Sequence, residues 1–204
     1  MKASSFYRFV YAIGVKPWEA ESEGMATQLE SLIEREEVSR QRPYGSALDL
    51  GCGSGRWSVV LARRGWQVAG VDAVRKAVRA AQRRAEEERV DVRFVEGDVT
   101  ALSEAGVGAG FEFFLDVECF NHLSDRDRAA MGREVSAVAS ADATLLLLVW
   151  ARARRGPFPP GASRQDLEAA FPGWRIVAED RYQGELPAPL KRIDPRWYRL
   201  SHSS

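Results

Sequence analysis

Three glycines at alternate positions, Gly51, Gly53 and Gly55, constrain this 204-residue chain more than any other feature. They follow the apolar segment 47–50 and precede the amphipathic segment 56–62, so they lie between an expected strand and an expected helix. Glycine allows left-handed backbone conformations and close approach of a ligand. The free N–H groups at the start of the helix favour a negatively charged ligand group. The pattern predicts a cofactor-binding loop, and the simpler alternative is a structural turn.

The spacing of the glycines separates two classes of cofactor loop. The dinucleotide fingerprint G-x-G-x-x-G requires a third glycine where this chain has Arg56. The pattern D-x-G-x-G-x-G, which begins at Asp49, instead resembles the glycine motif of the class I S-adenosylmethionine-dependent methyltransferases. This resemblance implies S-adenosyl-L-methionine as the cofactor. The loop residues that it implies as cofactor contacts are Asp49, Gly51, Cys52, Gly53 and Gly55.

Length and charge narrow the class of protein. A chain of this length fits a single domain, residues 1–204. Its 29 basic and 29 acidic residues balance, so it lacks the overall positive charge of a protein that grips nucleic acid through the phosphates. We therefore expect a small-molecule partner rather than nucleic acid.

The two cysteines, Cys52 and Cys119, give neither a disulfide framework nor a zinc spacing. The sequence has no recognisable signal peptide and no apolar run long enough to cross a bilayer. These features predict a cytoplasmic protein with no membrane segment and no bound metal.

Short apolar runs alternate with helical patterns from residue 46 onward. The expected strands are 47–50, 67–71, 92–95, 111–117 and 144–150, with two further candidates at 174–180 and 196–200. Such alternation predicts an α/β, Rossmann-like, doubly wound fold, with a mostly parallel sheet and helices on both faces. We expect residues 46–150 to form the cofactor-binding core and 151–204 to complete the sheet on the substrate side.

Helical spacing of apolar residues predicts a helix over 74–89. Two further helices have predicted capping boxes, because Ser124 and Ser163 each precede an aspartate by three residues.

Acidic residues follow the second and third expected strands. Asp72 lies where a carboxylate accepts hydrogen bonds from the ribose hydroxyls of an adenosine, with a helix N-cap as the alternative role. The segment 95–99 resembles the methyltransferase segment whose acidic residue, here Asp98, accepts a hydrogen bond from the adenine amino group; a turn residue is the alternative. Ala73 and Val99 are the neighbouring candidates for cofactor contact, and Val99 or Leu102 would cover one face of the adenine.

The fourth strand leads into Asp116 and the segment 117–123, which resembles the fourth-strand motif of the family. This resemblance implies that Asp116 helps to hold the amino group of the cofactor and that the following positions face the acceptor. The expected acceptor contacts here are Phe120, His122 and, after the fifth strand, Trp150. His122 is also the candidate catalytic base, with packing as the alternative. We expect Arg152, Arg154 and Arg155 to form a solvated loop, because nearly all basic residues of this chain are arginine.

Aromatic residues crowd the first twenty positions. The segment Pro17-Trp18-Glu19 resembles that of the thiopurine and tellurite-resistance type methyltransferases, which implies that Trp18 and Tyr11 cover the cofactor and the acceptor. Residues 1–45 are therefore expected to form a helical cap or lid, against the alternative of a helix packed on the sheet.

These observations predict an enzyme that transfers a methyl group from S-adenosyl-L-methionine to a sulfur, oxygen or nitrogen nucleophile of a small molecule. Two alternatives stay open at this point. One is an RNA or DNA methyltransferase, and the other is a cofactor-binding protein without catalytic activity.

Overall fold

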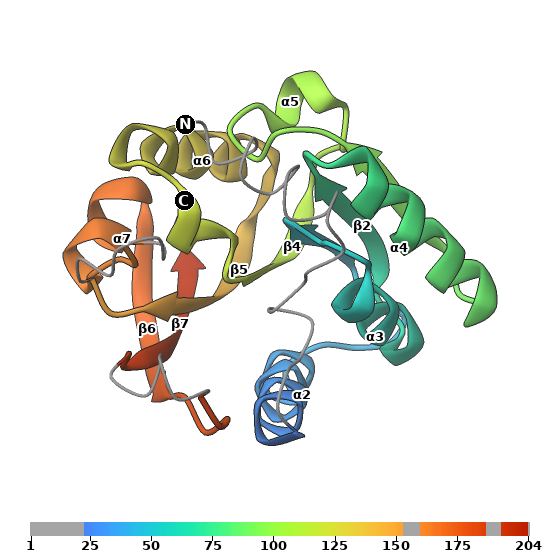
Figure 1. Ribbon diagram of the computed structural model, residues 1–204, viewed down its shortest axis with the longest axis horizontal. Coiled ribbons are helices and arrows are strands. Elements are labelled where there is room, and N and C mark those ends of the chain that lie inside the picture. Colours follow the sequence, from blue (N-terminus) through green and yellow to red (C-terminus); the bar gives the residue numbers. More distant parts are fainter. Residues whose placement is uncertain (1–22, 153–159, 187–192, 204) are drawn as a thin grey trace.

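The computed structural model describes residues 23–152, 160–186 and 193–203 (Figure 1). Its elements are, in chain order, α2 (Glu23–Glu37), β1 (Ser46–Leu50), α3 (Arg56–Arg64), β2 (Gln67–Asp72), α4 (Arg75–Glu87), β3 (Val92–Glu96), α5 (Leu102–Ala105), β4 (Phe111–Val117), the 3₁₀ turn η2 (Cys119–His122), α6 (Asp125–Val138), β5 (Ala139–Trp150), α7 (Arg164–Ala170), β6 (Trp174–Arg181) and β7 (Pro195–His202).

Seven strands form one sheet in the order β3-β2-β1-β4-β5-β7-β6. The pairs among β1 to β5 are parallel, whereas β7 runs antiparallel to both β5 and β6. All seven expected strands are present, and β5 begins five residues earlier than expected. The prediction of a doubly wound, mostly parallel sheet is confirmed.

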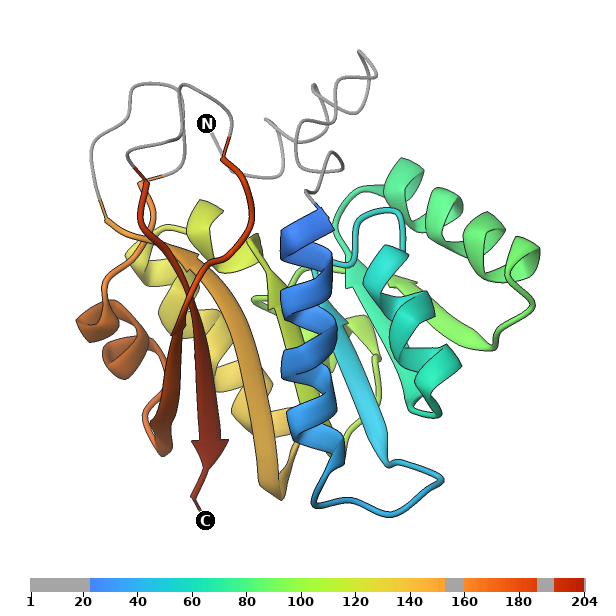
Figure 2. The ribbon, with the colours of Figure 1, turned by 90° about the horizontal axis from the view of Figure 1, so that it is seen from below.

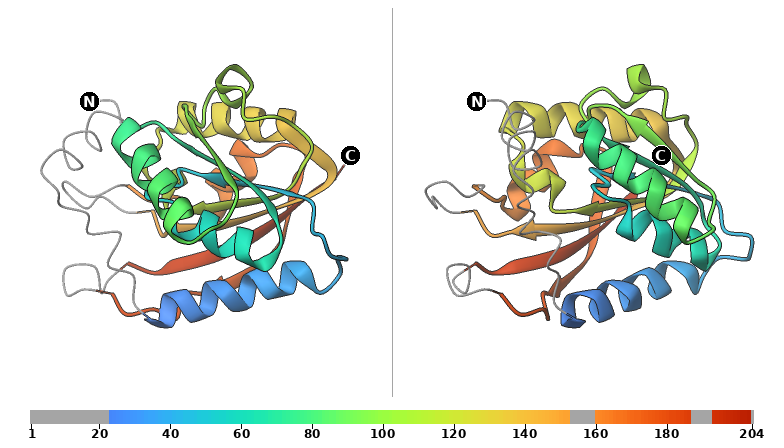
Figure 3. Two further views of the ribbon diagram at one scale, coloured as in Figure 1. Left: turned by 90° about the vertical axis from the view of Figure 1, so that its right-hand side faces the viewer. Right: turned by 45° about the vertical axis from the view of Figure 1, so that its right-hand side comes forward.

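Helices cover both faces of the sheet (Figure 3). On one face, apolar side chains of α6 and α7, such as Met131, Val135 and Leu167, pack against the strands. On the other face, α2 and α3 lie beside each other (Figure 2), and they contribute Leu29 and Trp57 to a second apolar cluster. Because both faces are buried, the central strands are nearly continuous apolar runs.

Helix α2 is part of this core. Leu29 and Ile33 have no exposed surface, and burying each stabilises the fold by about 1.5–3 kcal/mol. Polar side chains also fix the helix, because Glu36 accepts a hydrogen bond from the Thr144 hydroxyl at 2.8 Å. The Gln28 amide donates to the carbonyl oxygen of Arg181 at 2.6 Å. For residues 23–45 the structure therefore supports the alternative interpretation, a helix packed on the sheet, and the rest of the expected lid lies outside the described residues.

Both predicted N-cap serines of α6 and α7 are confirmed, but only α7 has the full capping box that was predicted for both helices. The Ser124 and Ser163 hydroxyls accept hydrogen bonds from the backbone N–H groups of Asp127 and Asp166, and at Ser163 the Asp166 carboxylate completes the capping box. Helix α4 begins at Arg75 with Val74 as its N-cap residue. Within the described part of the chain, no helix combines the length and apolar character needed to span a bilayer.

Candidate active site

The strand order reverses between β1 and β4, and this position organises the site. The chain winds from β1 outward to β3 and then returns to place β4 on the other side of β1. In open α/β sheets, ligands bind at such a switch point, beyond the carboxyl ends of the strands. Residues 51–55 follow β1, and residues 118–122 follow β4. The two loops, which carry six of the predicted site residues, therefore meet at this edge.

The glycine loop has the backbone that its sequence predicts. Gly51, Gly53 and Gly55 have φ values of 72°, 55° and 77°, which are unfavourable for residues with a Cβ atom. The N–H groups of Gly51 and Cys52 both donate to the carbonyl oxygen of Val71, at 2.9 Å. The loop is thus tied to the end of β2.

Gly51 also lies against the loop that follows β4. A Cβ atom on Gly51 would be 2.8 Å from Cβ and 2.9 Å from Sγ of Cys119, which is closer than van der Waals contact allows. The absence of a side chain at Gly51 therefore permits the two loops to touch.

Asp49 lies beneath the loop. It is 3% exposed, and its Oδ2 atom accepts a hydrogen bond from the Ser58 hydroxyl of α3 at 2.5 Å. This contact fixes the start of α3 relative to β1.

Asp72 bridges two backbone segments at the end of β2. Its Oδ2 accepts from the N–H of Gly53 at 2.9 Å, and its Oδ1 accepts from the N–H of Val74 at 2.8 Å. Burial raises the pKa of this carboxyl group, and the two backbone hydrogen bonds oppose the shift. Val74, the N-cap residue of α4, makes no side-chain cap, so Asp72 supports the residue before the helix rather than capping it directly. Ala73 lies between them and is half-buried.

Asp98 forms a turn after β3. Its Oδ1 accepts hydrogen bonds from the N–H and the hydroxyl of Thr100, at 2.9 and 2.8 Å, and the residue is exposed. Val99 and Leu102, the expected cover for an adenine, belong to the apolar core with 6% and 0% exposure. In this structure neither offers an open face to a ligand.

Asp116 is fully buried at the end of β4. It accepts a hydrogen bond from the N–H of Phe120, at 3.1 Å from Oδ2, and so closes the η2 turn. Burial raises the pKa of this carboxyl group well above its usual range, although its backbone hydrogen bonds oppose the shift.

Glu118, which the sequence analysis did not single out, joins β4 to β5. It has a φ of 76° without being glycine, and its carboxylate accepts a hydrogen bond from the indole N–H of Trp150 at 3.0 Å. A positive φ at a residue other than glycine is a strained conformation that is often found at functional sites. Trp150 is 8% exposed, and its ring centroid lies 6.4 Å from that of His122. Glu118, His122 and Trp150 thus form one cluster at the ends of β4 and β5.

His122 is half-buried. Burial and, secondarily, the positive charge of Arg128 lower its pKa to about 4. The imidazole is therefore neutral at physiological pH and is a weaker base than an ordinary histidine.

The neighbouring Phe120 is fully buried and packs on Phe171, with 5.7 Å between ring centroids. This placement contradicts the expectation that the Phe120 side chain contacts the acceptor.

Carboxylates converge on this edge of the sheet. The pKa of the Cys119 thiol is raised well above its usual value by burial and then by the negative charges of Asp116, Asp72, Asp98 and Asp49. These acids come from the ends of β4, β2, β3 and β1. Such a cluster of acidic side chains suits a ligand that carries positive charge and hydrogen-bond donors.

Two hollows lie away from the glycine loop. One, of about 190 Å³, lies where β5 ends and β7 begins and includes Arg152 and Arg196. Arg152 is paired with Asp125 and Asp166, and Arg196 with Glu179 and Asp194, so neither side chain is an isolated positive charge.

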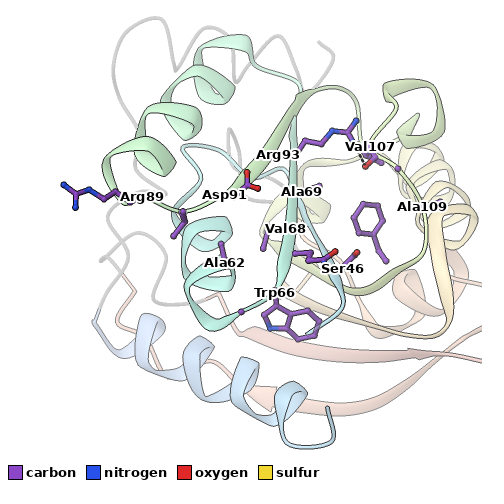
Figure 4. Close-up of a pocket in the computed structure, with 15 residues that line it drawn as sticks. Ser46, Ala62, Trp66, Val68, Ala69, Arg89, Asp91, Arg93, Val107 and Ala109 are labelled. Atoms are coloured by element: carbon purple, nitrogen blue, oxygen red, sulfur yellow. Dashed lines mark hydrogen bonds between the residues drawn. The ribbon is translucent and has the colours of Figure 1, made fainter. Parts of the chain in front are cut away.

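The larger hollow, of about 820 Å³, includes Ser46, Gln67 and Phe111, which begin β1, β2 and β4 (Figure 4). It lies at the amino ends of the strands, the edge opposite the glycine loop. This hollow is therefore separate from the predicted site. Trp18 and Tyr11, the predicted covering aromatics, and Arg154 and Arg155 lie outside the described residues.

Comparison with known proteins shows what the first five strands resemble. Residues 47–142, which run from β1 into the start of β5, match a family model described as a methyltransferase domain. This segment therefore resembles a class I methyltransferase domain. It contains the glycine loop, Asp72, Asp98 and the η2 turn, and the cofactor of such domains is S-adenosyl-L-methionine.

Sequence relatives and solved structures agree with this assignment. The ubiquinone biosynthesis O-methyltransferase of Ruegeria pomeroyi is 32% identical over 91 residues, which are 44% of this chain and 36% of that protein. The magnesium protoporphyrin IX methyltransferase of Synechocystis with bound S-adenosylmethionine superposes with a TM-score of 0.75 at 18% identity, covering 100% of this chain and 98% of the other. TehB of Haemophilus influenzae superposes with a TM-score of 0.67 at 16% identity, over 86% of this chain and 62% of the other. The chain thus spans about a third of the length of the first relative, and the structural likenesses concern the fold.

Proposed function

We propose that this protein transfers a methyl group from S-adenosyl-L-methionine to a sulfur, oxygen or nitrogen nucleophile of a small molecule. One observation carries the proposal: a left-handed glycine loop and four carboxylates from neighbouring strand ends meet at the switch point of a methyltransferase sheet. The match of residues 47–142 to a methyltransferase family supports it.

The residues present fit the cofactor. Gly51, Gly53 and Gly55 hold the loop in a left-handed backbone that residues with a Cβ atom disfavour. Asp72 and Asp98 are carboxylates at the ends of β2 and β3, where acceptors for ribose hydroxyls and an adenine amino group are needed. Asp116 and Asp49 are buried acidic side chains at the ends of β4 and β1, and we assign them to the positively charged part of the cofactor. When bound, S-adenosyl-L-methionine supplies a methyl group that is already activated by a positively charged sulfur.

The chain's own residues then have to hold and orient the acceptor and exclude water, effects that contribute several kcal/mol to rate enhancement. We assign this role to Trp150 and His122, which lie beside each other at the ends of β5 and β4. A neutral His122 accepts a proton from the acceptor, but its lowered pKa makes it a weak base. The site is therefore suited to acceptors that ionise readily, such as thiols and acidic phenols.

We further propose a relationship to the thiopurine and tellurite-resistance type enzymes, with Trp18 and Tyr11 covering the ligands. The likeness to TehB gives weak support, since it is a likeness of fold. The name of the Ruegeria relative favours an oxygen acceptor. The balanced charge supports a small-molecule acceptor over nucleic acid, and the two free cysteines agree with a cytoplasmic location.

The test is a turnover screen with the full chain. S-adenosyl-L-methionine is incubated with thiols, phenols and N-heterocycles, and the release of S-adenosylhomocysteine is measured for each. A Gly51→Ala variant is the matched control for methyl transfer that does not depend on the site. Release above this control with any acceptor supports the proposal. Binding of the cofactor without turnover of any acceptor would favour a non-catalytic cofactor-binding protein, and turnover on RNA or DNA alone would replace the small-molecule acceptor.

A further inference from the structure

Arg128, in the first turn of α6, is buried to an unusual degree for a charged residue. It is 1% exposed, and its guanidinium carbon lies 4.9 Å from the ring centroid of Phe120. Its carboxylate partner, Asp125, at 3.2 Å, has a side chain that is 71% exposed. Removing an arginine charge from water costs several kcal/mol, and apolar side chains of similar size often stabilise a core as well or better. Stability alone is therefore a weak reason for an arginine at this position.

The other partners of Arg128 are backbone carbonyl groups. Its Nε donates to the carbonyl oxygen of Phe120 at 3.2 Å, and its Nη2 donates to the carbonyl oxygens of Asn121 at 3.4 Å and Gly161 at 2.7 Å. Phe120 and Asn121 are the two residues before His122 in the η2 turn. Gly161 lies in the segment that returns from the end of β5. One planar side chain thus joins the loops that follow two neighbouring strands.

The Gly161 end of this link is itself fixed beside Trp150. A Cβ atom on Gly161 would be 2.4 Å from the carbonyl oxygen of Trp150, and the N–H of Ala162 donates to that oxygen at 2.8 Å. Asn121 makes a second connection, because its side-chain oxygen accepts from the N–H of Trp150 at 2.9 Å. Arg128 therefore spans from the backbone around His122 to the backbone around Trp150.

We propose that Arg128 is a positioning residue, which sets the placement of His122 relative to Trp150 on the acceptor side of the site. This inference rests on the proposed function, in which those two side chains contact the acceptor. The fork of five N–H donors on arginine reaches three carbonyl groups and a carboxylate at once, and the compact ammonium group of lysine does not.

The positive charge of Arg128 has an effect on the pKa of His122 that can be measured separately from enzyme activity. Several charged or titratable groups surround the η2 turn: Arg128 and Asp125 from α6, Asp116 and Glu118 from the end of β4, Arg152 after β5 and Asp166 from α7. Among these, the positive charge of Arg128 adds to burial in lowering the pKa of His122. Removing this charge should raise the pKa of His122, while replacing it with another cation should not.

The experiment compares Arg128→Met and Arg128→Lys with Arg126→Met, an exposed position on the same helix. The chain has only two histidines, His122 and His202, so NMR of the imidazole protons follows His122 with His202 as an internal reference. We expect the His122 midpoint to rise in Arg128→Met and to stay near about 4 in Arg128→Lys. With an acceptor found in the screen, kcat should fall about 10–100-fold in both variants, while the affinity for S-adenosylhomocysteine stays within about twofold of the Arg126→Met value.

Three results would overturn the proposal: a His122 midpoint in Arg128→Met equal to that of Arg126→Met, an undiminished kcat in Arg128→Lys, or equal losses of kcat and S-adenosylhomocysteine affinity. If Arg128→Met does not fold, the kcat and affinity of Arg128→Lys decide alone. If the wild-type protein turns over no acceptor, the proposed function fails, and the NMR titration still tests the link from Arg128 to His122.

Discussion

The carboxylate of Asp72 accepts a hydrogen bond from the backbone N–H of Gly53, with 2.9 Å between oxygen and nitrogen. This contact joins the end of β2 to the middle of the glycine loop after β1. The same carboxylate also holds the N–H of Val74. Asp72 therefore supports the glycine loop even without a ligand. A test of its role in ligand binding has to distinguish a loss of binding from a loss of stability.

Asp72→Ala should weaken the binding of S-adenosylhomocysteine by about 1–3 kcal/mol, because ribose hydroxyls lose a charged acceptor. Calorimetry measures the affinity, and Asp142→Ala, an exposed residue of β5, is the control. Asp72→Asn keeps one acceptor oxygen and should lose less. Unchanged affinity in Asp72→Ala together with a lower melting temperature would show that the residue only supports the turn.

Gly51→Ala should reduce both stability and cofactor binding. Its new Cβ would meet Cys119 at 2.8 Å while the backbone keeps a φ of 72°, and we expect a loss of about 2–4 kcal/mol in the free energy of unfolding. Gly106→Ala is a matched control, since Gly106 has a φ of 69° and open space around it; it should lose about 1–2 kcal/mol from strain alone. Denaturant unfolding compares the two.

Adding Cys119→Gly to Gly51→Ala should recover the part of the loss that the collision causes. Equal losses in Gly51→Ala and Gly106→Ala would contradict close contact between the two loops.

The strands and their order along the chain were predictable, because apolar runs between glycine-rich turns have a simple pattern. The antiparallel direction of β7 could not be predicted, because the sequence of a terminal strand of eight residues does not indicate whether the strand pairs in a parallel or an antiparallel way. Helix α5 and the turn η2 are only four residues long, too short for a helical period. The burial of Arg128 could not be predicted, because a single arginine in an arginine-rich sequence looks like a surface residue. The burial of Phe120 depends on Phe171, fifty-one positions later in the chain, which no local pattern reveals.

The pH dependence of stability should report the burial of His122. Its pKa is about 4 in the folded protein and 6.5 in its ordinary state, so between these values the unfolded chain binds more protons. The stabilisation is complete above pH 6.5 and is lost as the pH falls towards 4, by about 2 kcal/mol at pH 5.

Urea unfolding of the wild type and of His122→Gln at pH 7 and pH 5 measures this difference, with His202→Gln as the control. His122→Gln should lose less stability on acidification than the wild type. An identical loss in both proteins would contradict a lowered pKa at His122.

Deleting residues 1–20 should leave a folded domain, because α2 begins at Glu23 and remains fixed to the sheet by Gln28 and Glu36. If Trp18 and Tyr11 cover the ligands, methyl transfer should fall steeply in the truncated chain. Melting temperature and release of S-adenosylhomocysteine are the two measurements. A truncated chain that aggregates, or one that retains full activity, would contradict the lid.

Calorimetric titration of the full chain with S-adenosylhomocysteine and, separately, with NAD tests the central claim most directly. Arg56 occupies the position of the third dinucleotide glycine, and Asp98 is the proposed acceptor for the adenine amino group. The account predicts saturable, one-site binding of S-adenosylhomocysteine, weakened by Asp72→Ala, and no measurable binding of NAD at the same concentrations. Saturable binding of NAD with no response to S-adenosylhomocysteine would contradict it.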